Sequence, residues 1–147
     1  MKKVIFSLML VLTAAFAMNT VNAQTTSGAK IDFTKDTQYY GKIKNGADGT
    51  CTFEFKNTGN APLIISNAKG SCGCTVPEWP KEPIAPGAKA SIKVKYDTSR
   101  QGVINKNVTI TSNAVNAAEK IIYIKGNVLP APESGAPVNN SGAPTKN

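Results

Sequence analysis

From Asn57 to Asp97 the chain reads NTGNAPLIISNAKGSCGCTVPEWPKEPIAPGAKASIKVKYD. Turn residues divide this stretch into short runs, with Asn-Thr-Gly-Asn near its start and Pro-Gly near its end. The last run alternates apolar and polar side chains, which is typical of a β-strand with one buried face. Between the runs lies a connection that carries Cys72 and Cys74. The stretch therefore predicts turn, strand, cysteine loop, turn and strand, in that order.

The same alternation continues on both sides of this stretch. The positions expected to face a core are Cys51, Phe53, Phe55, Ala90, Ile92, Val94, Tyr96, Val108 and Ile110. Further strands are expected at 31–33, 39–43, 63–68 and 121–128. Segment 69–83 is expected to be a loop, because glycine and proline interrupt it. Short strands at a spacing of roughly 8–12 residues predict an all-β, immunoglobulin-like β-sandwich of about seven strands. A small β-barrel is the alternative.

The N-terminal segment has the features of a secretory signal peptide. Lys2 and Lys3 precede an apolar run, and small or short side chains lead to Ala23. We expect residues 1–23 to be removed by cleavage between Ala23 and Gln24, which would make the protein periplasmic or secreted. The apolar run is shorter than the about 20 residues that a membrane helix needs. We therefore expect no membrane span after cleavage, and an uncleaved anchor is the alternative.

The remaining chain divides into a domain and a tail. Residues 24–129 are long enough for one small domain, the predicted sandwich. Residues 130–147 are rich in Pro, Ala, Ser, Gly and Asn and contain almost no large aliphatic side chain. Such a segment cannot bury enough apolar surface to offset its ordering entropy, so a disordered tail is expected.

Composition restricts the chemistry. The chain has no histidine, and its three methionines all lie before residue 24. The commonest general base and metal ligand is thus absent, so we expect no cofactor, no metal and no catalytic residue. The formal net charge is +8, and Lys89, Lys93 and Lys95 share one face of a strand. We interpret this face as protection of a sheet edge and of solubility, with attraction to anionic envelope surfaces or polysaccharide as the alternative. Nucleic acid is not expected as a partner, because no arginine cluster or aromatic-studded basic stripe is present.

Several short motifs carry a resemblance to a known family. They are Phe53-x-Phe55-x-Asn57-Thr58-Gly59, Pro62-Leu63, Cys72-Gly73-Cys74-Thr75, Pro86-Gly87 and Ser112-Asn113. Over about residues 31–128 the chain resembles a bacterial exported family known as domain of unknown function 1573, which looks related to Hydin-type immunoglobulin-like modules. The resemblance implies a sandwich and an envelope location. It implies no established activity and no catalytic residues.

The three cysteines leave several pairings open. Cys51 shares the apolar parity of its strand and is expected to be a small buried hydrophobe. In an extended chain the Cα atoms of Cys72 and Cys74 would lie roughly 6.6–7.2 Å apart, too far for a relaxed disulfide, but Gly73 permits a bend. The alternatives are a local disulfide, free or packed thiols, a bond from Cys51 to one of the pair, and metal or redox chemistry.

Two function classes follow from these features. The first is a non-catalytic binding or scaffolding module of the bacterial envelope, with an envelope protein or polysaccharide as partner. The second is a thiol-disulfide or metal-handling protein that uses Cys72 and Cys74. A hydrolase is the least supported class, because spacing alone argues for no close carboxylate pair. Trp79 is either a partner-binding anchor or a lid across the end of the core.

Overall fold

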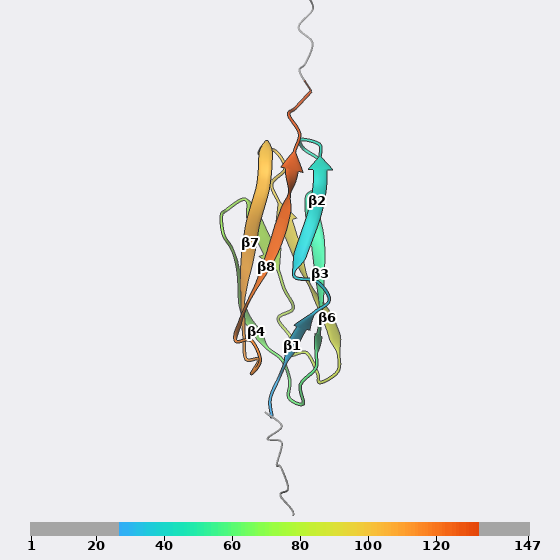
Figure 1. Ribbon diagram of the computed structural model, residues 1–147. Coiled ribbons are helices and arrows are strands. Elements are labelled where there is room, and N and C mark those ends of the chain that lie inside the picture. The colour runs from blue at the N-terminus through green and yellow to red at the C-terminus, as the bar shows by residue number, and fades with distance from the viewer. Residues whose placement is uncertain (1–26, 133–147) are drawn as a thin grey trace, which may run out of the picture.

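The computed structural model describes residues 27–132, which form two four-stranded β-sheets packed face to face (Figure 1). The strands are β1 (Ile31–Phe33), β2 (Thr37–Ile43), β3 (Thr50–Asn57), β4 (Ile65–Gly70), β5 (Thr75–Glu78), β6 (Lys89–Tyr96), β7 (Gly102–Ser112) and β8 (Glu119–Val128). Within this range no helix is long and apolar enough to cross a membrane. The predicted cleavage site at Ala23 and Gln24, and the predicted tail beyond residue 132, lie outside the described residues.

The strand order confirms the predicted sandwich. The first sheet runs β1-β3-β6-β5 and the second runs β2-β8-β7-β4, so the sheets do not close into one barrel. This order is the immunoglobulin arrangement, except that the first extended segment is divided between the sheets. Its first part, β1, pairs antiparallel with β3, whereas β2 pairs parallel with β8. This division accounts for eight strands where about seven were predicted.

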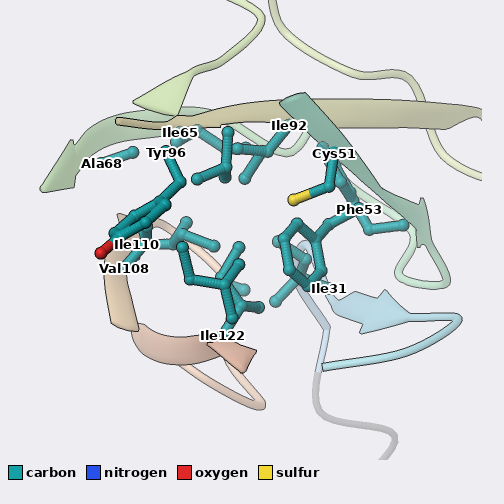
Figure 2. Close-up of a cluster of buried hydrophobic side chains, with 14 of the residues drawn as sticks. Ile31, Cys51, Phe53, Ile65, Ala68, Ile92, Tyr96, Val108, Ile110 and Ile122 are labelled. Carbon is teal, nitrogen blue, oxygen red and sulfur yellow. The ribbon is translucent and has the colours of Figure 1, made fainter. Parts of the chain in front are cut away.

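The core lies between the sheets, where the predicted inward side chains meet (Figure 2). Phe53, Ile92 and Val94 come from the first sheet and are fully buried. They face Val108, Ile110, Ile122 and Ile124 of the second sheet, all at most 1% exposed. The period of two therefore holds in both sheets, because alternate side chains of a strand point to opposite faces.

Segment 69–83 is only partly the loop that the sequence predicted. Strand β4 begins at Ile65 and extends to Gly70, and β5 follows from Thr75. Leu63, expected to begin that strand, instead forms an isolated bridge with Ile84. Strand β5 was not predicted from the sequence because it contains Pro77, and proline is unfavourable within a strand. Proline is tolerated here because β5 is an edge strand, where one side of the backbone needs no partner.

The position of β6 corrects the interpretation of its lysines. Lys93 and Lys95 are exposed on the outer face, as predicted. However, β6 lies between β3 and β5 and is not an edge strand. These lysines therefore keep an outer sheet face in water and protect no edge.

Candidate functional site

Cys72 and Cys74 form a disulfide where the chain crosses from the second sheet to the first. Their Cα atoms are 5.2 Å apart, closer than in an extended chain, because the backbone turns at Gly73. The Thr75 N–H donates to the Cys72 carbonyl oxygen over 3.2 Å and closes this turn. Cys51 is free and buried. The structure therefore brings together the two loop cysteines and leaves Cys51 apart from them.

Hydrogen bonds hold this cystine turn at both ends, to Asn107 of β7 before the turn and to Asp97, the residue after β6, at Cys74. The Ser71 N–H donates to the Asn107 carbonyl over 2.9 Å, and the Ser71 hydroxyl accepts from the Asn107 N–H over 3.2 Å. The Asp97 N–H donates to the Cys74 carbonyl over 2.9 Å. A Cβ on Gly70 would lie 2.0 Å from the Thr75 carbonyl oxygen, so only glycine fits at this close approach.

The two sulfur atoms differ in accessibility. Cys74 is 4% exposed, whereas Cys72 is half-buried. The buried Thr75 hydroxyl lies 3.6 Å from the Cys72 sulfur and 3.9 Å from the Cys74 sulfur. A thiolate from solvent would therefore reach Cys72 first. In the described residues no group of three or more Cys, Asp or Glu side chains is arranged to hold a metal ion.

The Cys51 thiol lies in a setting that suppresses its reactivity. Burial raises the pKa of this thiol, and the neighbouring Tyr40 hydroxyl only partly opposes the effect. Burial likewise raises the pKa of Tyr40, whose hydroxyl donates to the Gly49 carbonyl over 2.6 Å. Reactive cysteines have a lowered pKa. Cys51 is accordingly part of the core (Figure 2).

Trp79 follows edge strand β5 and packs half-buried against the core. The Lys81 ammonium lies 3.2 Å from the centroid of its ring, a cation–π contact. Its indole N–H is buried without a hydrogen-bond partner. This placement corresponds to the lid alternative of the sequence analysis, and a role for Trp79 in partner binding stays a prediction.

Asn57 has a structural role that its sequence motif did not predict. The motif predicted a turn, but the Asn57 side chain is fully buried. Its amide nitrogen donates to the Ala61 and Ile84 carbonyls over 2.8 and 2.9 Å. Its amide oxygen accepts from the Lys30 and Gly59 N–H groups over 3.2 and 3.0 Å. Four bonds thus join three separate segments at one end of the sandwich.

At the same end, the side-chain amides of two further asparagines hydrogen-bond backbone groups, as a neighbouring strand would. The Asn116 side chain accepts from the Ile31 N–H and donates to the Ile31 carbonyl, both over 3.0 Å. The Asn113 side chain accepts from the Ile64 N–H over 2.8 Å and donates to the Pro62 carbonyl over 3.0 Å. Asparagine can do this because its amide carries both donor and acceptor. These asparagine motifs therefore hold loops in place.

The outer face of the second sheet was missed in the sequence. Three exposed apolar side chains lie on its strands: Tyr39 on β2, Val103 on β7 and Ile121 on β8, which are 68%, 78% and 42% exposed. Alternation in each strand predicts that such residues face outward. Only the sheet order shows that they belong to one surface.

Solved structures show the same fold at low identity. A protein of unknown function from Porphyromonas gingivalis is 17% identical with a TM-score of 0.61, and the match covers 69% of this chain and 48% of that one. The secreted serine protease VesC from Vibrio cholerae is 15% identical with a TM-score of 0.52, over 67% of this chain and 23% of the protease. The ASH/PapD-like domain 7 of human CEP192 is 8% identical with a TM-score of 0.55, and the match covers 70% of this chain and 87% of that domain.

These similarities are informative about fold alone, because each identity is below 25%. The chain spans about half of the length of the first structure and about a quarter of the protease. No curated protein matches the sequence. The likeness to Hydin-type modules stays a prediction. The family model described as Protein of unknown function (DUF1573) matches residues 31–128, two thirds of the chain, and this protein therefore belongs to that family.

Proposed function

We propose that this protein is a non-catalytic binding module of the bacterial cell envelope, which holds a partner on its surface. The observation that carries the proposal is the outer face of the second sheet. There Tyr39, Val103 and Ile121 are exposed on three neighbouring, hydrogen-bonded strands. Exposed apolar side chains on a rigid sheet favour binding, because little conformational entropy is lost when they are covered.

The position of the asparagines supports the same interpretation. Asn57, Asn113 and Asn116 direct their side-chain amides to backbone groups of the fold itself. The motifs that carry the family resemblance therefore build a scaffold. A scaffold of this kind presents its sheet faces and loops to a partner.

Retention of envelope components on the immobilised mature chain tests the proposal. We expect saturable retention of a component from the envelope fraction of the producing bacterium, with competition by free protein. Absence of any saturable retention would contradict a binding module. Intact-mass analysis of the envelope-derived protein tests the location, with an N-terminus at Gln24 as the expected result and retained Met1 as the contrary one.

A second candidate function is thiol–disulfide exchange, and the accessibility of Cys72 favours it. A partner thiolate would attack the Cys72 sulfur, form a mixed disulfide and release the Cys74 thiolate. A second thiol of the partner would then displace Cys72. The partner dithiol is thereby oxidised to a disulfide, and the Cys72–Cys74 disulfide is reduced to two thiols.

Exchange kinetics with a small dithiol separate the two candidates. If exchange is the function, wild type and Cys51→Ala should both oxidise dithiothreitol much faster than glutathione disulfide does. Cys72→Ser should lose this reaction. A rate for wild type no greater than for glutathione disulfide would leave the cystine as a structural bond.

A further inference from the structure

We propose that the outer face of the second sheet binds an anionic polysaccharide, which specifies the partner of the binding module proposed above. Strand β8 runs through this face, with β2 on one side and β7 on the other, in the front of Figure 1. Ile122 and Ile124 of β8 are buried, so the alternate positions 121, 123, 125 and 127 face outward. The face is therefore continuous across three strands.

Aromatic rings, amides and ammonium groups lie side by side on this face. Lys125 is paired with Tyr39 of β2 on one side and with Asn105 of β7 on the other. In the neighbouring row, Tyr123 is paired with Asn107. The Lys125 ammonium lies 5.9 Å from the centroid of the Tyr123 ring.

This combination suits a charged sugar polymer. Tyrosine rings offer flat apolar surface to the C–H faces of sugar rings and keep a hydroxyl in water. Asparagine amides both donate to and accept from sugar hydroxyls. Lysine supplies a mobile point charge for a carboxylate, phosphate or sulfate group. The next row, with Lys42 and Val103 on either side of Asn127, repeats the pattern of amide and ammonium.

Charge distinguishes the two sheets. The outer face of the second sheet carries Lys42, Lys69 and Lys125 and one carboxylate, Glu119 at the start of β8. Lys106 and Lys120 are paired with the buried Ile124 and Ile110 and do not share this face. The strands of the first sheet contain four lysines and three carboxylates, and its Lys93 forms an ion pair with Glu78 at 3.9 Å. Among residues 27–132, Lys42 and Lys125 take part in none of the ion pairs. The outer face of the second sheet therefore carries three lysines against one carboxylate, a net positive charge to which a polyanion is complementary.

The same face is poorly suited to other occupants. A second copy of this chain, docked face to face about a twofold axis near the centre of the face, would bring Lys125 close to its own counterpart. A dry protein interface is depleted in lysine at its centre. Here Lys125 lies in the middle of the face, and the exposed Val103 and Ile121 lie near opposite ends of β8. A hydrated, negatively charged ligand agrees best with this distribution.

Binding of the full mature chain to defined polymers tests the proposal, with alginate as the anionic polysaccharide, dextran as the neutral one and polyglutamate as an acidic polypeptide. We expect alginate to bind, dextran to bind weakly or not at all, and added salt to weaken alginate binding. The double variant Lys42→Gln/Lys125→Gln should bind alginate about tenfold more weakly. Tyr39→Ala should lose affinity several-fold although it removes no charge.

The matched control is Lys93→Gln/Lys95→Gln, which removes the same charge from the first sheet and should keep affinity within about twofold. Unchanged far-UV circular dichroism shows that each variant is folded. Equal losses of affinity in both double variants, or no loss in Tyr39→Ala, would show that alginate binds through the overall positive charge of the protein, and would overturn the proposed face. Tighter binding of polyglutamate would point to an acidic protein instead.

Retention of envelope components separates this inference from the proposed function. If wild type and Lys42→Gln/Lys125→Gln retain the same component equally, the module binds through another surface and only the present inference fails. If neither protein retains any component, the proposed function fails as well.

Discussion

Asn57 is a fully buried polar residue at one end of the sandwich, and its surroundings explain why it is tolerated there. Both amide hydrogens and both acceptor positions of its side chain are used, and its backbone N–H donates to the Ala88 carbonyl over 2.9 Å. A buried polar group that is fully hydrogen-bonded loses little relative to water. Removing the amide would leave its backbone partners without these hydrogen bonds, which would destabilise the folded state.

Replacing Asn57 with alanine should lower the free energy of unfolding by about 3 kcal/mol or more, because four partly or fully buried backbone groups lose their hydrogen bond to its side chain. Urea denaturation of the purified domain measures this loss. Asn60→Ala is the matched control. Asn60 is exposed and accepts from the Gly28 N–H over 2.7 Å, so its removal should cost less than about 1 kcal/mol. Similar losses in both variants would contradict the special role of Asn57.

Cys51 should make the folded domain less stable at alkaline pH. Its pKa is raised by burial, so the folded state favours the protonated thiol. This contribution is fully present below the pKa of the unfolded thiol, about 8.5, and is lost as the pH rises through the higher folded value. We therefore expect the free energy of unfolding to be constant from pH 6 to pH 8 and to fall towards pH 10. Urea unfolding at each pH measures this, and Cys51→Ala should give a shallower fall. An equally steep fall in Cys51→Ala would assign the effect to other groups, Tyr40 among them.

At the scale of elements, the crossing from β4 to β5 depends on one close backbone contact. Gly70 ends β4 and lies against the carbonyl of Thr75, the first residue of β5. Gly73, between the two cysteines, has no atom within 4 Å of the position of a Cβ. Two glycines of one corner therefore differ in what a side chain would meet.

Gly70→Ala should destabilise the domain by about 1–3 kcal/mol, because the added methyl group can be accommodated only if the backbone of β4 or β5 shifts. Gly73→Ala should be tolerated within about 0.5 kcal/mol, as is usual for a surface substitution. The midpoint of urea denaturation for the two variants tests this difference. A larger loss in Gly73→Ala than in Gly70→Ala would show that the cystine turn, and not the contact with Thr75, controls the corner.

At the scale of the whole molecule, the sandwich is stabilised by its core more than by its disulfide. Within residues 27–132, twenty apolar side chains are buried between the two sheets and at their ends. The disulfide joins residues only two positions apart. Closing so short a segment removes little conformational freedom from the unfolded chain, about 2 kcal/mol or less.

Reduction of the Cys72–Cys74 disulfide should therefore leave the protein folded. We expect mild reductant to release two thiols that react with iodoacetamide, while far-UV circular dichroism keeps its β-sheet form. Cys51 should react only after denaturation, because it is buried. Loss of the β-sheet spectrum on reduction would show that the corner is essential for the fold. Rapid labelling of Cys51 in the native protein would contradict its place in the core.

The sequence by itself determined the all-β class and the direction of most side chains. Alternation of apolar and polar residues is a local property, and it correctly predicted that Phe53, Val94 and Ile110 face the core. Turn residues are local as well, so the connections at Asn57 and at Pro86-Gly87 were recognisable. Proline in β5 was the exception, because its effect depends on whether the strand lies at an edge.

Only the tertiary structure decided which distant segments meet. The division of the first strand between the sheets, the interior position of β6 and the bonds of Asn57 to Lys30 and Ile84 all join residues far apart in the chain. The same holds for the candidate surface, since Tyr39, Asn105 and Lys125 become neighbours only when β2, β8 and β7 are paired. Local patterns specify a strand and its buried side, but the neighbour of that strand is chosen by packing of the whole core.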